Sequence, residues 1–211
     1  MKSRFKTLTS ILIGLTALLV IRVLITILLE YRFYFPPDFD QAFFLAGRRE
    51  SFYGWYSAGF YLHIISGPIA IVAVLVMLAT GKSKRFRTVH RATGKMLALI
   101  TVFAVCPGGF LIAFQSIGGP IASYGFCCLG MATLVSVLAT AHFARKKQIK
   151  THMNWAYRSA ILLCSPVLLR LSTGLFSVID AESINTYRAL AWLSWILPLV
   201  IFEIVRNQKG R

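Results

Sequence analysis

Long runs of apolar residues separated by short polar segments dominate this chain of 211 residues. Several of the runs approach the ~20 apolar residues that a helix needs to cross a bilayer. The pattern predicts an all-α fold of six transmembrane helices, with helices two to five as a four-helix core. No long polar linker separates two cores, so we expect a single integral membrane domain over residues 1–211. The predicted helices cover residues 8–29, 57–80, 95–115, 121–144, 153–178 and 188–205.

Composition supports a membrane protein, because 57% of the residues are hydrophobic and only 14% are charged. A soluble domain carries about 25% charged residues. The first apolar run follows three basic residues, as in a signal peptide. It is long for one, however, and no small-residue cleavage site follows it, so we interpret it as an uncleaved first helix.

The net charge of +16 reflects basic segments beside the apolar runs, namely the N-terminus, residues 81–95, the segment between helices four and five, and the C-terminal tail. Six of the seven acidic residues lie in the opposite loops. This asymmetry predicts that both termini are cytoplasmic in a bacterial inner membrane. It also argues against nucleic-acid binding and favours attraction of the basic loops to anionic lipid headgroups.

Two local patterns bear on helix packing. Pro107, within Cys106-Pro107-Gly108-Gly109, interrupts the third helix, and proline removes a backbone donor and usually kinks a helix. Ala132, Ser136 and Thr140 recur at every fourth residue of the fourth helix, which suits close contact with a neighbouring helix.

Three histidines are expected at one depth near the cytoplasmic face. His90 lies just before helix three, His142 near the end of helix four, and His152 at the start of helix five. Imidazoles from different helices could ligate a haem b, with Arg91 and Arg158 neutralising its propionates. A divalent metal held by the three histidines is chemically reasonable as well. Alternatively, the histidines simply lie at headgroup level beside the basic loops.

A second group of basic residues is expected near the outer face. An arginine within the hydrocarbon costs at least ~2.5–3.5 kcal/mol, so it normally faces the bundle interior or marks a site. Arg22, His63 and Arg170 could therefore line a pocket for an anion, although they could also extend toward the outer headgroups. Glu203, near the cytoplasmic end of helix six, is expected to pair with the basic loops or Arg206.

The sequence lacks the motifs of several classes of enzyme. The chain contains no Walker phosphate-binding loop, no HExxH and no GxSxG. Its four cysteines lie in apolar runs without a CxxC and are interpreted as packing residues. The sequence therefore leaves open whether the protein is an enzyme.

The residues His63, His90-Arg91-x-x-Gly94, His152-x-x-Trp155-x-x-Arg158 and Arg170 form a recognisable set. The set resembles bacterial membrane proteins grouped as domain of unknown function 2306. The resemblance covers roughly His63 to Val178 and implies a multi-pass membrane protein. That family has no established activity to transfer to this chain.

In architecture the chain is also similar, more distantly, to transmembrane cytochromes of the b-561 type. Those have six helices, cytoplasmic termini and histidines on the four central helices that hold two haems. Only His63 is expected near the outer face here, so the similarity implies at most one haem, on the cytoplasmic side.

Three hypotheses for the function follow. The first is a haem-associated electron-transfer protein that uses the cytoplasmic histidines, with a redox partner or as a homo-oligomer. The second is a small transporter, or a protein that binds an anion or lipid in the outer pocket. The third is a non-catalytic assembly or scaffold protein.

Overall fold

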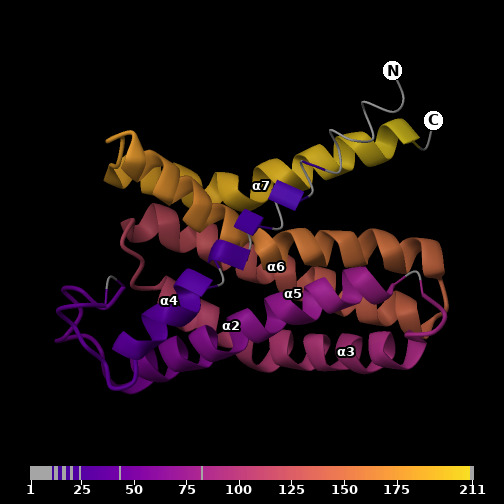
Figure 1. Ribbon diagram of the computed structural model, residues 1–211, viewed down its shortest axis with the longest axis horizontal. Coiled ribbons are helices and arrows are strands. Elements are labelled where there is room, and N and C mark those ends of the chain that lie inside the picture. Colours follow the sequence, from indigo (N-terminus) through magenta and orange to yellow (C-terminus); the bar gives the residue numbers. More distant parts are fainter. Residues whose placement is uncertain are drawn as a thin grey trace. The chain divides into compact units, whose positions relative to one another are not determined.

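The computed structural model describes residues 11, 14–15, 18–19, 21–23, 25–42, 44–81 and 83–209 (Figure 1). It divides into two compact units, Met1–Phe52 and Tyr53–Arg211, which are described separately. Within these residues the regular structure is helical apart from one isolated bridge between Tyr34 and Pro37. The all-α prediction is confirmed, while the prediction of a single membrane domain stays a prediction.

The first unit holds the N-terminal part of the chain. The predicted first helix, 8–29, falls largely outside the described residues, and those described within it are helical. A short 3-10 helix, η1 (Tyr31–Phe33), follows. Beyond it the Asp38 carboxylate accepts the backbone N–H groups of Asp40 and Gln41 at 3.0 and 3.1 Å, which fixes a turn in this polar connection.

The second unit contains five helical segments that are long and apolar enough to cross a membrane, which correspond to predicted helices two to six. One of these segments is continuous in direction but divided into α3, the π-helix η2 and α4. The elements are α2 (Gly54–Thr80), α3 (Arg87–Ile100), η2 (Thr101–Val105), α4 (Cys106–Ala113), α5 (Gly119–Arg145), α6 (Ile149–Val178) and α7 (Ile184–Lys209).

The helices extend beyond the apolar runs, most of all at their basic ends. α3 begins at Arg87, eight residues before the predicted start, because the basic residues 87–95 are helical and do not form a loop. Arginine and lysine are good helix formers, so a helix continues into the headgroup region after the apolar pattern stops. The connections shrink to 81–86 and 146–148. We call the end of the unit that carries these two connections the basic end.

The backbone of the short α5–α6 connection ends α5 and reverses the direction of the chain. Lys147 adopts a left-handed conformation with φ 57°, and the N–H of Gln148 donates to the carbonyl of Phe143 at 3.0 Å. This arrangement is the Schellman termination of a helix. Three residues therefore suffice to turn the chain, and α5 and α6 form an antiparallel pair.

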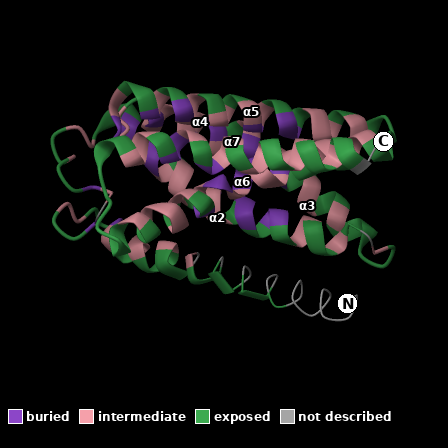
Figure 2. Cartoon of the chain, turned by 90° about the horizontal axis from the view of Figure 1, so that it is seen from above, coloured by how far each residue is buried: buried purple, intermediate pink, exposed green. Residues whose placement is uncertain are grey.

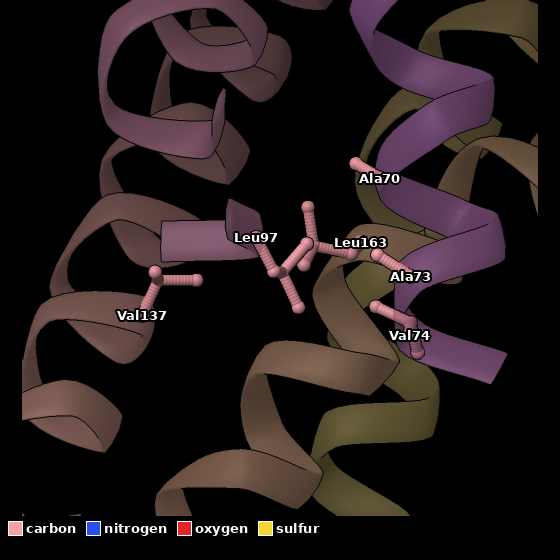
Figure 3. Close-up of a cluster of buried hydrophobic side chains, with 6 residues drawn as sticks. All are labelled: Ala70, Ala73, Val74, Leu97, Val137 and Leu163. Carbon is pink, nitrogen blue, oxygen red and sulfur yellow. The ribbon is translucent and has the colours of Figure 1, made fainter. Parts of the chain in front are cut away.

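The apolar centre of the unit is built from four spans (Figure 3). Helix α2 supplies two alanines and a valine, α3 and α6 supply one leucine each, and α5 supplies one valine. The four contributing spans are the predicted core helices two to five, whereas α7 packs on α5 and α6. The buried cluster comprises Ala70, Ala73, Val74, Leu97, Val137 and Leu163.

The third span changes its winding where the sequence interrupts it. Pro107 has no N–H to donate to the preceding turn, and the five residues of η2 directly before Cys106 are wound as a π-helix. Pro68, Pro166 and Pro198 lie inside continuous helices instead. The predicted interruption at Pro107 is therefore accommodated as a π-helical segment.

Much of the outward surface of the second unit is exposed (Figure 2), and many of its exposed side chains are large and apolar. Leu99, Phe103 and Leu138 are 60%, 71% and 50% exposed. Apolar exposure of this extent along several long helices is what lipid-facing surfaces require. The lipid bilayer is therefore the environment of this protein.

Candidate functional site

His90 lies near the start of α3, at the basic end. Its Nδ1 is 3.2 Å from Oγ1 of Thr80, the last residue of α2. The Thr80 hydroxyl donates its hydrogen to the carbonyl of Val76 at 2.7 Å, so this oxygen accepts from the imidazole. Nδ1 of His90 therefore donates to Thr80. The backbone carbonyl of Met77 is a second hydrogen-bond partner of this ring.

His152 has the same arrangement near the start of α6. Its Nδ1 lies 3.0 Å from the carbonyl oxygen of Thr140 on α5, and a carbonyl can only accept. The Thr140 hydroxyl also lies 3.0 Å from the hydroxyl of Ser159 on α6, which ties the two helices together below the histidine. Nε2 of His152 is thus a lone-pair donor with a fixed tautomer.

The two histidines are close enough for their charges to interact, and both are half-buried. They come from helices that share their neighbours, since α2 and α5 each pack against both α3 and α6. A fixed Nδ1–H bond that leaves Nε2 available is how ligating histidines are usually oriented in proteins. We call His90 and His152 the histidine pair.

His142 does not join this pair. It is exposed and lines a groove between α3 and α5, with its ring in an edge contact with Phe143 at 5.2 Å between centroids. Among the described residues, no group of three or more His, Cys, Asp or Glu side chains could hold a metal. The three histidines predicted as a metal site are therefore not brought together as one.

The two arginines predicted to neutralise propionates differ in their surroundings. Arg91 is exposed and directly follows His90. Arg158 is 15% exposed, and its guanidinium bonds both carboxylate oxygens of Glu203 on α7, at 2.6 and 3.1 Å. Its guanidinium also lies over the Trp155 ring at 4.6 Å. Arg158 therefore joins α6 to α7, and Arg91 is the cation that stays available.

Glu203 bonds a second arginine, Arg206, at 3.0 Å. The expected pairing of this carboxylate with Arg206 is thus present, and its bond to Arg158 agrees with the expected pairing with a basic segment. The two residues are 45 positions apart, so no helical spacing connects them.

At the opposite end, His63 contacts the π-helix. Its Nδ1 donates to the carbonyl of Val105 at 3.0 Å, and a Cβ added to Gly108 would lie 2.8 Å from the backbone nitrogen of His63. Arg170 on α6 is near enough for its charge to act on His63. Arg22 belongs to the first unit. The three-residue anion pocket therefore stays a prediction.

Thr80 and Thr140 are the residues of the site that the sequence did not single out as partners of histidines. A usable signal exists in retrospect. Each threonine lies near the end of one helix, and the histidine follows 10 or 12 positions later, after a short connection. Antiparallel helices joined by a short turn place such positions at one depth.

Residues 60–206 match the family model described as predicted membrane protein, domain of unknown function 2306 (DUF2306). The match takes in His63, the histidine pair, Arg158 and Arg170. No curated protein and no solved structure matches the chain. The similarity to b-561 type cytochromes accordingly stays a comparison of architecture.

Proposed function

We propose a function on the premise that this chain belongs to the DUF2306 family of predicted membrane proteins, an assignment that rests on the match over residues 60–206. In this proposal the protein binds one haem b at the basic end of its four-helix core, with His90 and His152 as axial ligands. Its role is electron transfer with a redox partner at the same face.

The observation that carries the proposal is the shared tautomer of the histidine pair. Both rings donate Nδ1–H, one to Thr80 and one to Thr140, so in the neutral rings Nε2 is the nitrogen that would ligate, from different helices at one end of the core. Haem iron receives four ligands from the porphyrin and needs two from the protein. Structural zinc needs four protein ligands, which the pair does not provide. The pair therefore favours haem over a bare metal ion.

The remaining residues of the site would bind and orient the group. Arg91 would provide a positive charge for a propionate. Thr80 and Thr140 would hold the imidazole rings in place through their hydrogen bonds. With His90 and His152 both holding it, the haem would supply one-electron transfer, which supports electron transfer over oxygen chemistry.

The visible spectrum of the purified full-length chain tests this proposal. Protein expressed with haem supply should show a Soret band and about one haem per chain. His90→Ala and His152→Ala should each lose most of the haem, because one axial ligand is missing. His142→Ala should retain it, because His142 faces the α3–α5 groove. Loss in His142→Ala equal to that in the other two variants would favour the three-histidine hypothesis instead.

The other two hypotheses are weaker proposals. An outer anion pocket is supported by the nearness of His63 and Arg170, but Arg22 lies in the other unit. A scaffold role has no feature of its own in the described residues. Purified protein that lacks haem but keeps its folded helices would move the preference to these two.

We further propose that the basic end and both termini face the cytoplasm of a bacterial inner membrane. The α2–α3 and α5–α6 connections carry lysine and arginine, whereas Asp180 and Glu182 lie at the opposite end, which fits the positive-inside bias. In a background without the native cysteines, a membrane-impermeant maleimide added to intact spheroplasts should label Ala181→Cys and not Ser83→Cys. The reverse labelling pattern would contradict this orientation.

A further inference from the structure

A groove with a volume of about 580 Å³ runs between α3 and α5 on the exposed surface of the second unit. One wall consists of Leu99 from α3 with Val102 and Phe103 from η2, and the other includes Leu138 from α5. Leu99 and Phe103 are among the most exposed apolar side chains of the unit. The groove is therefore open to the bilayer along an apolar floor, which suits a hydrocarbon chain.

One end of the groove is lined by polar side chains and not by apolar ones. His142 and Arg145 close it at the basic end, where α5 terminates. Among the described residues no carboxylate lies within ion-pair distance of Arg145. Arg158, by contrast, has its own carboxylate in Glu203. Arg145 is thus an exposed guanidinium at the polar end of the groove, without a carboxylate partner among the described residues.

We propose that this groove binds one anionic phospholipid, with an acyl chain along the α3–α5 walls and the phosphate on Arg145. The lining matches both halves of such a molecule. Leu138 and Arg145 are seven residues apart, roughly 10 Å along the helix, so the apolar and charged parts follow one another as they do in a lipid. A guanidinium fits a phosphate through two parallel hydrogen bonds. Free phosphate would leave the apolar walls unused.

Native mass spectrometry of the detergent-purified full-length chain tests this site. The chain is mixed with equal amounts of phosphatidylglycerol and phosphatidylcholine that carry identical acyl chains. We expect phosphatidylglycerol to bind about tenfold better, because the choline cation of phosphatidylcholine neutralises its phosphate and is repelled by Arg145. Arg145→Gln should remove this preference. Lys146→Gln removes the same charge one residue further on, outside the groove lining, and should change the preference less than about twofold.

The apolar half of the site has its own variants. Leu138→Trp and Leu99→Trp each fill the groove from one wall, without a change in charge, and should reduce binding of both lipids about tenfold. Both positions are exposed, so the fold should persist, and circular dichroism checks this. Equal effects of Arg145→Gln and Lys146→Gln would overturn the proposal in favour of general surface attraction. Undiminished binding in both tryptophan variants would overturn the location.

Discussion

Replacing Arg158 with glutamine is expected to lower the free energy of unfolding by about 3 kcal/mol. The Arg158 side chain is 15% exposed and bonds both oxygens of Glu203, whose side chain is 31% exposed. Removal of the arginine leaves a largely covered carboxylate with Arg206 as its remaining cation. Breaking a fully buried pair costs 3–5 kcal/mol, and the partial exposure here places the expected loss at the lower end.

Three companion variants, Arg158→Lys, Glu203→Gln and the double variant, give this prediction its control. Arg158→Lys keeps the charge but loses the two-pronged geometry, so it should cost only about 1 kcal/mol. The double variant of Arg158→Gln with Glu203→Gln should be more stable than Arg158→Gln alone, because it contains no partly buried carboxylate that has lost its Arg158 partner. Chemical denaturation in detergent micelles, followed by tryptophan fluorescence, measures these differences. Strictly additive single and double variants would contradict a direct coupling across α6 and α7.

Gly108→Ala is expected to destabilise the protein by about 2 kcal/mol. A Cβ at this position would lie 2.8 Å from the backbone nitrogen of His63 and 2.9 Å from the carbonyl oxygen of Gly59. Both atoms belong to the backbone of α2, so a side-chain rotation cannot relieve the contact. Helix α4 would have to move away from α2, and the hydrogen bond between His63 and Val105 would lengthen.

The matched control for this variant is Gly67→Ala, the same substitution on α2. A Cβ at Gly67 meets no atom within 4 Å, so the change should be neutral or stabilising by up to about 1 kcal/mol. Thermal unfolding of the two variants under identical conditions compares them directly. A Gly108→Ala protein as stable as Gly67→Ala would mean that α2 and α4 are not in close contact at this point.

The positions of the helices could be predicted from the sequence because each span needs a run of apolar residues. Their ends could not, because α3 and α6 begin with basic turns that carry no apolar signal. Pro107 marked an interruption in the third span, yet the sequence did not indicate that the chain would accommodate it with π-helical winding.

The sequence predicts the three histidines at one end of their helices, but it does not by itself give the direction in which each side chain points around its helix. Thr140 had been assigned to a packing row of helix four, and its hydroxyl indeed contacts Ser159 on α6. His142 follows Thr140 by two residues, about 200° around the helix, so a packing row that includes Thr140 turns His142 outward. The sequence therefore held the information that separates His142 from the pair.

The ion pair between Arg158 and Glu203 shows that a local sequence pattern does not predict which residues of two different helices pair. Both residues lie near the basic end of their helices, so their depth was predictable. Which face of α7 packs on α6 depends on how the two whole helix surfaces fit together. The pairing of two residues 45 positions apart depends on this packing of the two helices and not on their spacing along the chain.

The reduced-minus-oxidised visible spectrum of the chain, recorded beside its three histidine variants, is the sharpest test of the proposed haem site at His90 and His152. We expect a haem b spectrum in the wild type and in His142→Ala, and its loss in His90→Ala and His152→Ala, with all four proteins folded. A wild-type protein without haem despite haem supply would contradict the proposed site. Retention of haem by either His90→Ala or His152→Ala at the wild-type level would contradict it as well.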